Sequence, residues 1–229
     1  MILLKGDSKI KKIKCIFVVF AFVLLAVSCI EAYPQEQIEN TMVALSLGDY
    51  LSSSDIFKQI YGSGGSLYSL ELSRIILRRE NHNVALSLGV GFFSRTGVST
   101  FFEEETKFYL VPSSISGKYL FNTKYVIPFV ELGLGFYNYR EESNIHDTSG
   151  STFAWRMGCG TYIKIPKLKS LKLMVYLKKA RAIAVEDKIE IDVGGLELGI
   201  GFVIGFNLFN QIVFNIKPEL FSSREVILD

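Results

Sequence analysis

From residue 41 onward, bulky apolar residues alternate with small or polar residues over long stretches of the chain. In 195–206 every even position is leucine, isoleucine or phenylalanine, and the odd positions are glycine apart from Glu197 and Val203. The stretches 84–93, 126–136 and 153–165 follow the same scheme, whereas Arg74 interrupts it in 65–78. Because successive side chains of a β-strand point to opposite faces, this alternation predicts strands with one bulky apolar face and one small or polar face.

The alternating stretches predict about eight strands, at roughly 41–50, 65–78, 83–95, 106–121, 125–139, 152–165, 171–183 and 189–206. The links near 79–82, 122–124 and 166–170 are short. Those near 51–64, 95–105, 140–150 and 184–188 are mostly longer, and the first can hold a short helix over 55–60. Short and long links alternate, which is typical of an antiparallel up-and-down barrel with tight turns at one end and surface loops at the other.

The orientation of the two faces decides between two kinds of barrel. A soluble, lipocalin-like carrier would turn the bulky face inward and place charges outside. Here the second face is rich in glycine, alanine and serine, which suits a narrow lumen closed by eight strands and gives a poor water-facing exterior. We therefore predict an all-β, transmembrane β-barrel over 41–206 and keep the exported soluble carrier as an alternative.

The first residues have the composition of an export signal. Positions 5–14 are basic, positions 15–27 are apolar, and small residues follow. This order predicts a signal peptide over 1–32, cleaved after Ser28 or Ala32. Two alternatives remain open: an uncleaved anchor helix, and lipidation at Cys29.

Composition excludes several functions. The chain of 229 residues has a net charge of +2 and its basic residues are scattered, so no basic stripe indicates nucleic-acid binding. Cys159 is the single cysteine beyond residue 29, which predicts neither an internal disulfide nor a metal site. We expect no cofactor, because the glycines recur at every second position and form no phosphate-binding loop.

Aromatic residues gather near the predicted strand ends and suggest two girdles at the membrane–water interfaces. The candidates towards the long loops are Phe92, Phe93, Tyr109, Tyr137, Tyr139 and Trp155. Those towards the short turns are Tyr119, Phe121, Tyr125 and Phe206.

With patterns such as VELGLGFYNY and GLELGIGFVIGF, the segment 41–206 resembles the small bacterial outer-membrane β-barrel proteins of the OmpA and OmpX type. The resemblance implies a bacterial outer-membrane location and a lumen closed by ion pairs. As partners we expect outer-membrane lipid, lipopolysaccharide and the barrel-assembly machinery, and we expect a monomer. The residues 207–229 depart from the pattern, because such barrels often end at a terminal aromatic residue, and we assign them to a C-terminal extension.

Charged residues on the small face predict an ionic network in the lumen, since buried charges require partners or water. Its candidate members are Glu71, Lys118, Glu131, Arg156, Lys164, Lys178 and Glu197. Two interpretations are open: a polar core that closes the barrel, favoured by the small space within eight strands, and a gate in a narrow pore.

The sequence offers few candidate catalytic residues. His82 falls in a short turn, and His146 stands beside Asp147 and Ser149 in a polar loop, where proximity in sequence does not make a triad. We predict a non-enzymatic outer-membrane barrel with a role in envelope structure or surface interaction through its long loops. The alternatives are a small channel for ions or hydrophobic solutes and a lipid-modifying enzyme that uses His146.

Overall fold

The structure is a computed structural model that describes residues 39–79, 81–98, 105–143, 147–186, 189–207 and 214–215. The predicted signal peptide, with both cleavage positions and Cys29, lies outside these ranges. The same holds for His146 and for most of the predicted extension over 207–229.

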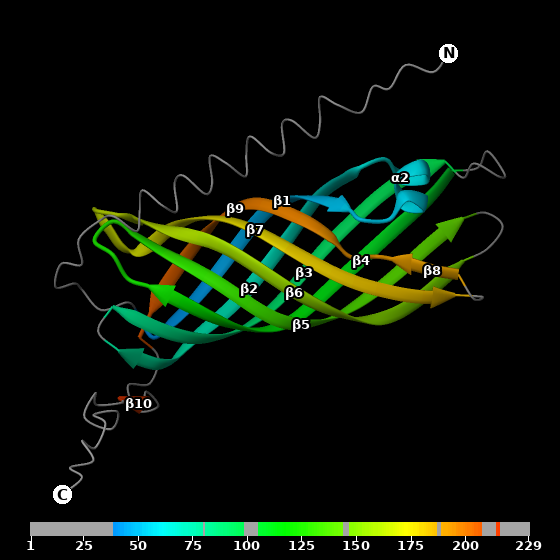
Figure 1. The fold of residues 1–229 in the computed structure, drawn as a ribbon. Coiled ribbons are helices and arrows are strands. Elements are labelled where there is room, and N and C mark those ends of the chain that lie inside the picture. Colours follow the sequence, from blue (N-terminus) through cyan, green and yellow to red (C-terminus); the bar gives the residue numbers. More distant parts are fainter. Residues whose placement is uncertain are drawn as a thin grey trace, which may run out of the picture.

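Within the described ranges, eight long strands form one closed antiparallel barrel (Figure 1). They are β1 (Thr41–Ser52), β2 (Gly64–Arg79), β3 (His82–Val98), β4 (Glu105–Phe121), β5 (Val126–Ser143), β6 (Thr148–Ile165), β7 (Leu168–Glu186) and β9 (Gly195–Phe206). Each of β1 to β7 pairs with the next strand along the chain, and β9 pairs with both β7 and β1 to close the sheet. The predicted antiparallel barrel of eight strands is confirmed.

The last predicted strand is interrupted. Residues 189–206 contain β8 (Ile189–Asp192), which forms a hairpin with the end of β7, and then β9, which pairs with β7 and β1. At the break, the Asp192 carboxylate accepts hydrogen bonds from the backbone N–H of Ala182 at 3.1 Å and of Gly194 at 2.9 Å. Because these bonds satisfy backbone groups where the strand is broken, the chain can turn there, and the prediction of one continuous strand is wrong at 193–194.

A two-residue strand, β10 (Phe214–Asn215), pairs parallel with β2 near the short turns. Close to it, the pairing of β2 with β3 shifts between Ile75 and Leu77, so that Ile76 is an extra residue on β2. Ile75 is fully buried whereas Ile76 is 41% exposed. From this β-bulge onward the inward and outward positions of β2 exchange, whereas Arg74 lies before the bulge on the outward-facing side of the strand. The bulge therefore does not explain the charged residue at position 74.

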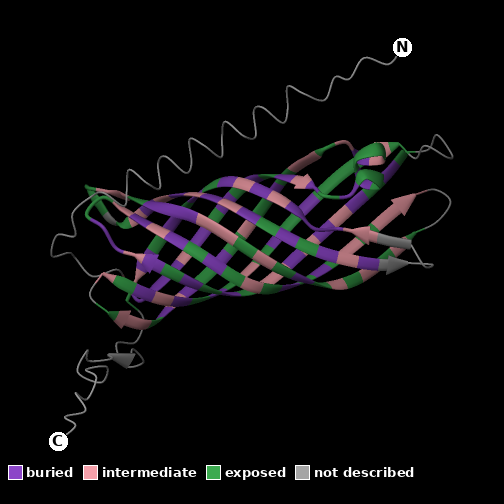
Figure 2. Cartoon of the chain, viewed as in Figure 1, coloured by how far each residue is buried: buried purple, intermediate pink, exposed green. Residues whose placement is uncertain are grey.

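The outer surface of the barrel carries the bulky apolar side chains, and exposed and buried residues alternate along the strands (Figure 2). Leu132 is 69% exposed and Leu45 is 64% exposed, whereas the adjacent Glu131 and Ala44 are buried inside. Apolar surface of this extent is unfavourable in water and favourable against acyl chains. The predicted outward orientation is confirmed, and the alternative of a soluble carrier with an apolar interior face is wrong.

The predicted aromatic girdle towards the long loops is only partly correct. Phe93 and Tyr137 are buried in the lumen, and Tyr139 packs against the same interior cluster. Phe92 and Phe93 are consecutive in β3, so one of them must point inward. The exposed aromatic residues at the two ends include Phe92, Trp155, Tyr119 and Tyr125.

A short helix, α2 (Asp55–Tyr61), lies at the long-loop end of the barrel (Figure 1). Ser54 caps the helix, since its hydroxyl oxygen accepts a hydrogen bond from the backbone N–H of Phe57 at 3.2 Å. At the other end of the helix, Nε of Arg95 in β3 donates to the carbonyl of Tyr61 at 3.1 Å. Both helix ends are thus fixed, and the helix reaches over the mouth of the barrel.

The helix and β3 approach each other closely at Gly97, where a Cβ atom would lie 2.3 Å from the carbonyl oxygen of Ile60. This approach places the buried rings of Phe57 and Tyr61 on the aromatic residues of the barrel wall. The ring centroids of Phe57 and Phe108 are 5.1 Å apart in an edge-to-face arrangement. The helix therefore packs as part of the barrel interior.

Two apolar clusters fill the lumen, one towards each end. The upper cluster, towards the long loops, consists of Tyr50, Phe57, Tyr61, Leu67, Phe93, Phe108, Leu110, Tyr137, Ala154, Ala180, Ala182, Ala184 and Val193. The lower cluster, towards the short turns, consists of Met42, Ala44, Ile75, Ala85, Leu120, Ile127, Phe129, Tyr162, Met174, Tyr176 and Val203. The predicted interior charges, apart from Lys164, lie in the layer between them.

Candidate functional site

Five of the seven predicted interior charges meet in the middle of the lumen, each from a different strand. We call them the central ion cluster: Glu71, Lys118, Glu131, Arg156 and Lys178. Lys118 Nζ contacts the Glu71 carboxylate and lies 3.4 Å from Glu131 Oε2. Lys178 Nζ lies 3.2 Å from Glu71 Oε2 and 3.6 Å from Glu131 Oε1. Nη2 of Arg156 lies 3.3 Å from Glu131 Oε1.

The strand register brings these charges together. Lys118 is paired with Glu131, Glu131 with Gly158, and Gly158 with Lys178. A Cβ atom on Gly158 would lie 2.9 Å from Cγ of Lys178 and 3.1 Å from Cγ of Glu131. Gly158, which lies between Glu131 and Lys178 in the strand register, therefore leaves the space that these two long side chains occupy.

Burial makes the pairing essential. Lys118 is 0% exposed and Glu131 is 1% exposed. A charge removed from water is tolerated only when opposite charges and hydrogen bonds replace the lost hydration. Glu131 has three cationic neighbours and Lys118 has two carboxylate neighbours, which meets this condition.

Two aromatic residues of the lower cluster support Lys118 from below. Its Nζ donates a hydrogen bond to the Tyr162 hydroxyl at 3.1 Å and lies 4.7 Å from the centre of the Phe129 ring. The rings of Phe129 and Tyr162 are stacked with their centroids 4.8 Å apart. The cation thus contacts acidic oxygens and electron-rich ring faces, and both favour a positive charge.

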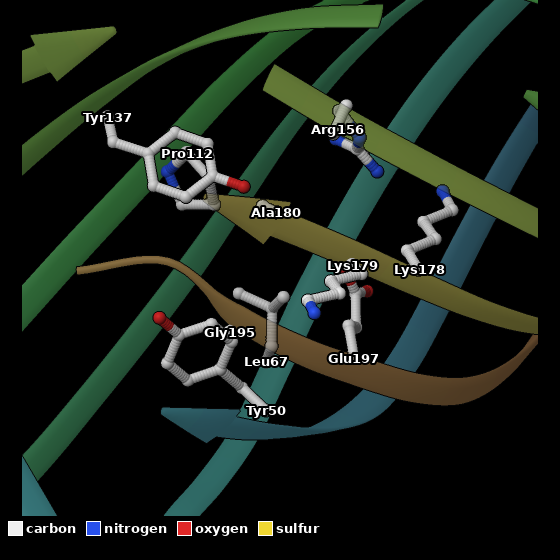
Figure 3. A pocket seen from close by; sticks show the side chains of 10 residues that line it. All are labelled: Tyr50, Leu67, Pro112, Tyr137, Arg156, Lys178, Lys179, Ala180, Gly195 and Glu197. Atoms are coloured by element: carbon white, nitrogen blue, oxygen red, sulfur yellow. The ribbon is translucent and has the colours of Figure 1, made fainter. Parts of the chain in front are cut away.

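Glu197 lies beside the central ion cluster but forms a different contact. Its Oε1 accepts hydrogen bonds from the Tyr176 hydroxyl at 2.5 Å and from the Ser69 hydroxyl at 3.4 Å. Figure 3 shows Arg156, Lys178 and Glu197, on β6, β7 and β9, among the residues that line a cavity of about 10 Å³. A neighbouring cavity of about 20 Å³ shares these three residues. Each has room for about one water molecule, so the charged layer is filled by side chains.

Lys164, the seventh candidate, lies away from the cluster. Its Nζ donates to Asn122 Oδ1 and to the Thr123 carbonyl, both at 2.8 Å. These contacts hold the short turn between β4 and β5. The structure therefore separates Lys164 from the lumenal charges with which the sequence grouped it.

Sequence reasoning missed a further interior ion pair. Lys172 Nζ lies 2.6 Å from Glu39 Oε2, and the Lys172 side chain is almost completely buried. The position of Lys172 on the inward face of β7 was a usable signal. Glu39 precedes β1, and the alternation within the strands contains no signal for it.

Other candidate chemistry is sparse. His82 lies at the start of β3 with its Nδ1 2.5 Å from the Tyr119 hydroxyl, and both groups are exposed. In the part of the chain that the structure describes, no three His, Cys, Asp or Glu side chains gather as metal ligands. No helix there is long and apolar enough to cross a membrane.

A closed eight-stranded barrel with an apolar exterior and a filled interior whose middle layer is charged defines the class of fold. It is that of the small transmembrane β-barrels of bacterial outer membranes.

Solved structures of outer-membrane proteins are similar to this chain in fold. The outer membrane protein OprG from Pseudomonas aeruginosa is similar with a TM-score of 0.55 and 12% identity, over 77% of this chain and 100% of that chain. Neisserial surface protein A is similar with a TM-score of 0.51 and 14% identity, over 75% of this chain and 100% of that chain. The outer membrane enzyme PagL matches with a TM-score of 0.45 and 15% identity, over 72% of this chain and 99% of that chain.

No protein-family profile matches the sequence, and no curated protein does. Likeness at such low identity establishes architecture, and one architecture hosts many functions. The features of this chain that bear on its function are therefore those of its lumen and its long-loop end.

Proposed function

We propose that the protein is a sealed, non-enzymatic barrel of the bacterial outer membrane, with its lumen as a structural core and its long-loop end as the surface for interaction. The observation that supports this most directly is the three-layer interior. The central ion cluster lies between two apolar clusters, and the cavities beside it have volumes of about 10 and 20 Å³. A conducting pore requires a continuous hydrated path, and this packing opposes one.

Planar-bilayer recordings of the refolded protein test the sealed lumen. We expect a flat current trace over a range of voltages, with no discrete openings. Discrete openings in the wild-type protein would overturn the proposal. An open porin recorded in the same bilayers provides the positive control.

A narrow gated channel is the second candidate, and one observation favours it. Among the described residues, two buried atoms of the central ion cluster, Glu131 Oε2 and Arg156 Nε, form no hydrogen bond, although Glu131 Oε2 lies 3.4 Å from Lys118 Nζ. Charges that are incompletely satisfied can exchange partners more easily than a fully bonded set. A channel of this kind would show openings whose frequency changes in Glu131→Gln, whereas a sealed barrel stays silent in both proteins.

The proposal of a non-enzymatic barrel is tested at His146, the histidine that stands beside Asp147 and Ser149 in sequence. We expect His146→Ala to leave the lipid A and phospholipid species of expressing cells unchanged in mass spectra. A lipid species that accumulates with the wild type and disappears in this variant would overturn the proposal.

We further propose that the barrel is a monomer surrounded by outer-membrane lipid and lipopolysaccharide. Closure of the sheet between β1 and β9 supports this, because the eight barrel strands present no unpaired edge to a second chain. Light scattering of the purified protein, corrected for bound detergent, should give the mass of one chain.

A further inference from the structure

An apolar pocket opens at the mouth of the barrel, between α2 and the opposite wall. Its volume is about 60 Å³, several times that of the cavities beside the central ion cluster. Space of this size accommodates about four to six groups of the size of a water molecule. The lining residues are Ile56, Phe57, Ile60, Tyr61, Phe108, Tyr139, Glu141, Thr148, Ala184, Ile191 and Val193.

The pocket combines four aromatic side chains with one carboxylate. Phe57 and Tyr61 come from α2, and Phe108 and Tyr139 come from β4 and β5. Aromatic ring faces attract cations, and the attraction grows when the cation leaves water. The same walls bury apolar groups, so they suit a ligand that is both apolar and positively charged.

Glu141 is the charged group of this pocket, and hydroxyl groups orient its carboxylate. Thr106 Oγ1 donates to Glu141 Oε1 at 3.1 Å, and the Tyr61 hydroxyl lies 3.0 Å from Thr106 Oγ1. Burial raises the pKa of the Tyr61 hydroxyl well above its usual range, so this hydroxyl stays protonated. The hydroxyl of Tyr61 can therefore donate to Thr106 while Thr106 donates to Glu141.

Among the described residues, Glu141 has no cationic partner within 4 Å, in contrast to its neighbour in sequence. Glu142 lies 3.2 Å from Arg140, and Arg140 also pairs with Asp147. An ionised carboxylate accepts about four hydrogen bonds, and covering it with an apolar ligand is costly unless that ligand brings a donor. The geometry thus favours a ligand with a cationic donor placed against Glu141.

From this geometry we propose that the mouth pocket binds a small organic ammonium cation. The ammonium group donates to the Glu141 carboxylate and lies against the aromatic rings, and the short apolar body fills the space between α2 and β8. This goes beyond the proposed function, because a sealed barrel needs no ligand, and a conducting barrel could bind one equally well.

The test uses n-butylammonium, whose five heavy atoms match the size of the pocket, together with n-butanol and butyrate as neutral and anionic analogues. The protein is refolded into nanodiscs with ¹³C-labelled isoleucine methyl groups. We expect n-butylammonium to shift the methyl signals of Ile56, Ile60 and Ile191 and to leave those of the lipid-facing Ile115 and Ile163 in place. n-Butanol should bind at least about tenfold more weakly, because it lacks the charge-assisted hydrogen bond.

Two variants and a matched control locate the site. Glu141→Gln keeps the shape of the side chain and should weaken n-butylammonium binding about tenfold or more. Glu142→Gln, one position along the strand, should bind like the wild type. Ala184→Leu should fill the pocket and weaken all binding to it.

Three results would overturn the proposal. One is equal binding of n-butylammonium by Glu141→Gln and Glu142→Gln. Another is binding of n-butanol or butyrate as tight as that of n-butylammonium. The third is unchanged binding in Ala184→Leu, once its altered migration between boiled and unboiled samples shows that it is folded.

Discussion

Charged side chains have opposite surroundings at the centre of the lumen and at its mouth. In the central ion cluster, Lys118 and Glu131 are fully buried and each contacts at least two opposite charges. At the mouth, Glu141 borders a pocket of about 60 Å³ and its carboxylate is held by a threonine hydroxyl. The first arrangement fills space and the second leaves space open.

The difference separates a structural role from a binding role. Removing one partner from a set of buried, paired charges strongly destabilises the fold, and the paired groups have few free hydrogen-bonding sites left for a ligand. A carboxylate beside an open apolar pocket contributes less to folding and retains acceptor capacity. Variants at the centre should therefore change stability, and variants at the mouth should change local order and binding.

The largest effect is expected at the centre. Lys118→Ala would leave two buried carboxylates short of a cation and should lower the free energy of unfolding by about 3–5 kcal/mol. Urea titration of the protein in detergent or lipid measures this loss. The exposed Lys107, on the same strand, provides the control, and its alanine variant should change stability by less than about 0.5 kcal/mol. Similar losses in both variants would contradict the role assigned to the cluster.

The contact between helix and wall should give the next largest effect. Gly97→Val places a Cβ atom against the Ile60 carbonyl and should destabilise the packing of α2 by about 1–3 kcal/mol. Faster hydrogen exchange of the α2 amides would report the displaced helix. Gly117→Val is the matched control, because a Cβ atom there meets nothing within 4 Å. If both variants leave the exchange of α2 unchanged, the helix does not depend on this approach.

A smaller effect is expected at the helix cap. Ser54→Ala removes the side-chain acceptor for the Phe57 N–H and should destabilise α2 by about 1 kcal/mol. Hydrogen exchange at the Phe57 amide should accelerate several-fold. The exposed Ser53 gives the comparison, and equal acceleration in Ser53→Ala would argue against a specific cap.

The smallest effect concerns an exposed pair on α2. Lys58 Nζ lies 2.8 Å from Asp55 Oδ1, and this hydrogen bond, with the charge of Lys58, lowers the pKa of Asp55. A lowered pKa means that the pair stabilises the helix above the pKa of the unfolded chain and that the stabilisation is lost as pH falls through the folded pKa. Carboxyl ¹³C titration should show a midpoint that rises in Lys58→Met. An unchanged midpoint would show that the pair is not formed in solution.

The barrel itself could be predicted from the sequence because alternation has a direct physical meaning. Residues on opposite faces of a strand must suit lipid on one side and a narrow lumen on the other. The parity of a position, that is, whether it is odd or even along the strand, therefore marks Glu71, Glu131 and Glu197 as interior. The short helix near 55–60 was also predictable from the length of its link. Parity failed where the backbone departs from a regular strand, at the bulge at Ile76 and at the break near Gly194.

The partners of the interior charges could not be predicted to the same extent. Parity assigns Lys164 to the inward face, but only the position along the barrel axis separates it from Lys118 and brings it to the turn at Asn122. That position depends on the register between strands, which the sequence specifies weakly. The mouth pocket depends on how α2, which packs against β3 and β1, lies opposite β5 and β8, and no strand pattern contains that information.

The central ion cluster also has a consequence for strand number. Glu71 on β2 and Lys178 on β7 are 107 residues apart along the chain and touch across the lumen at 3.2 Å. Such a contact exists only when the sheet has curled to one circumference, because an additional strand would widen the barrel and draw the two groups apart. The salt bridge therefore favours the eight-stranded closure over wider alternatives that the same alternating sequence would tolerate.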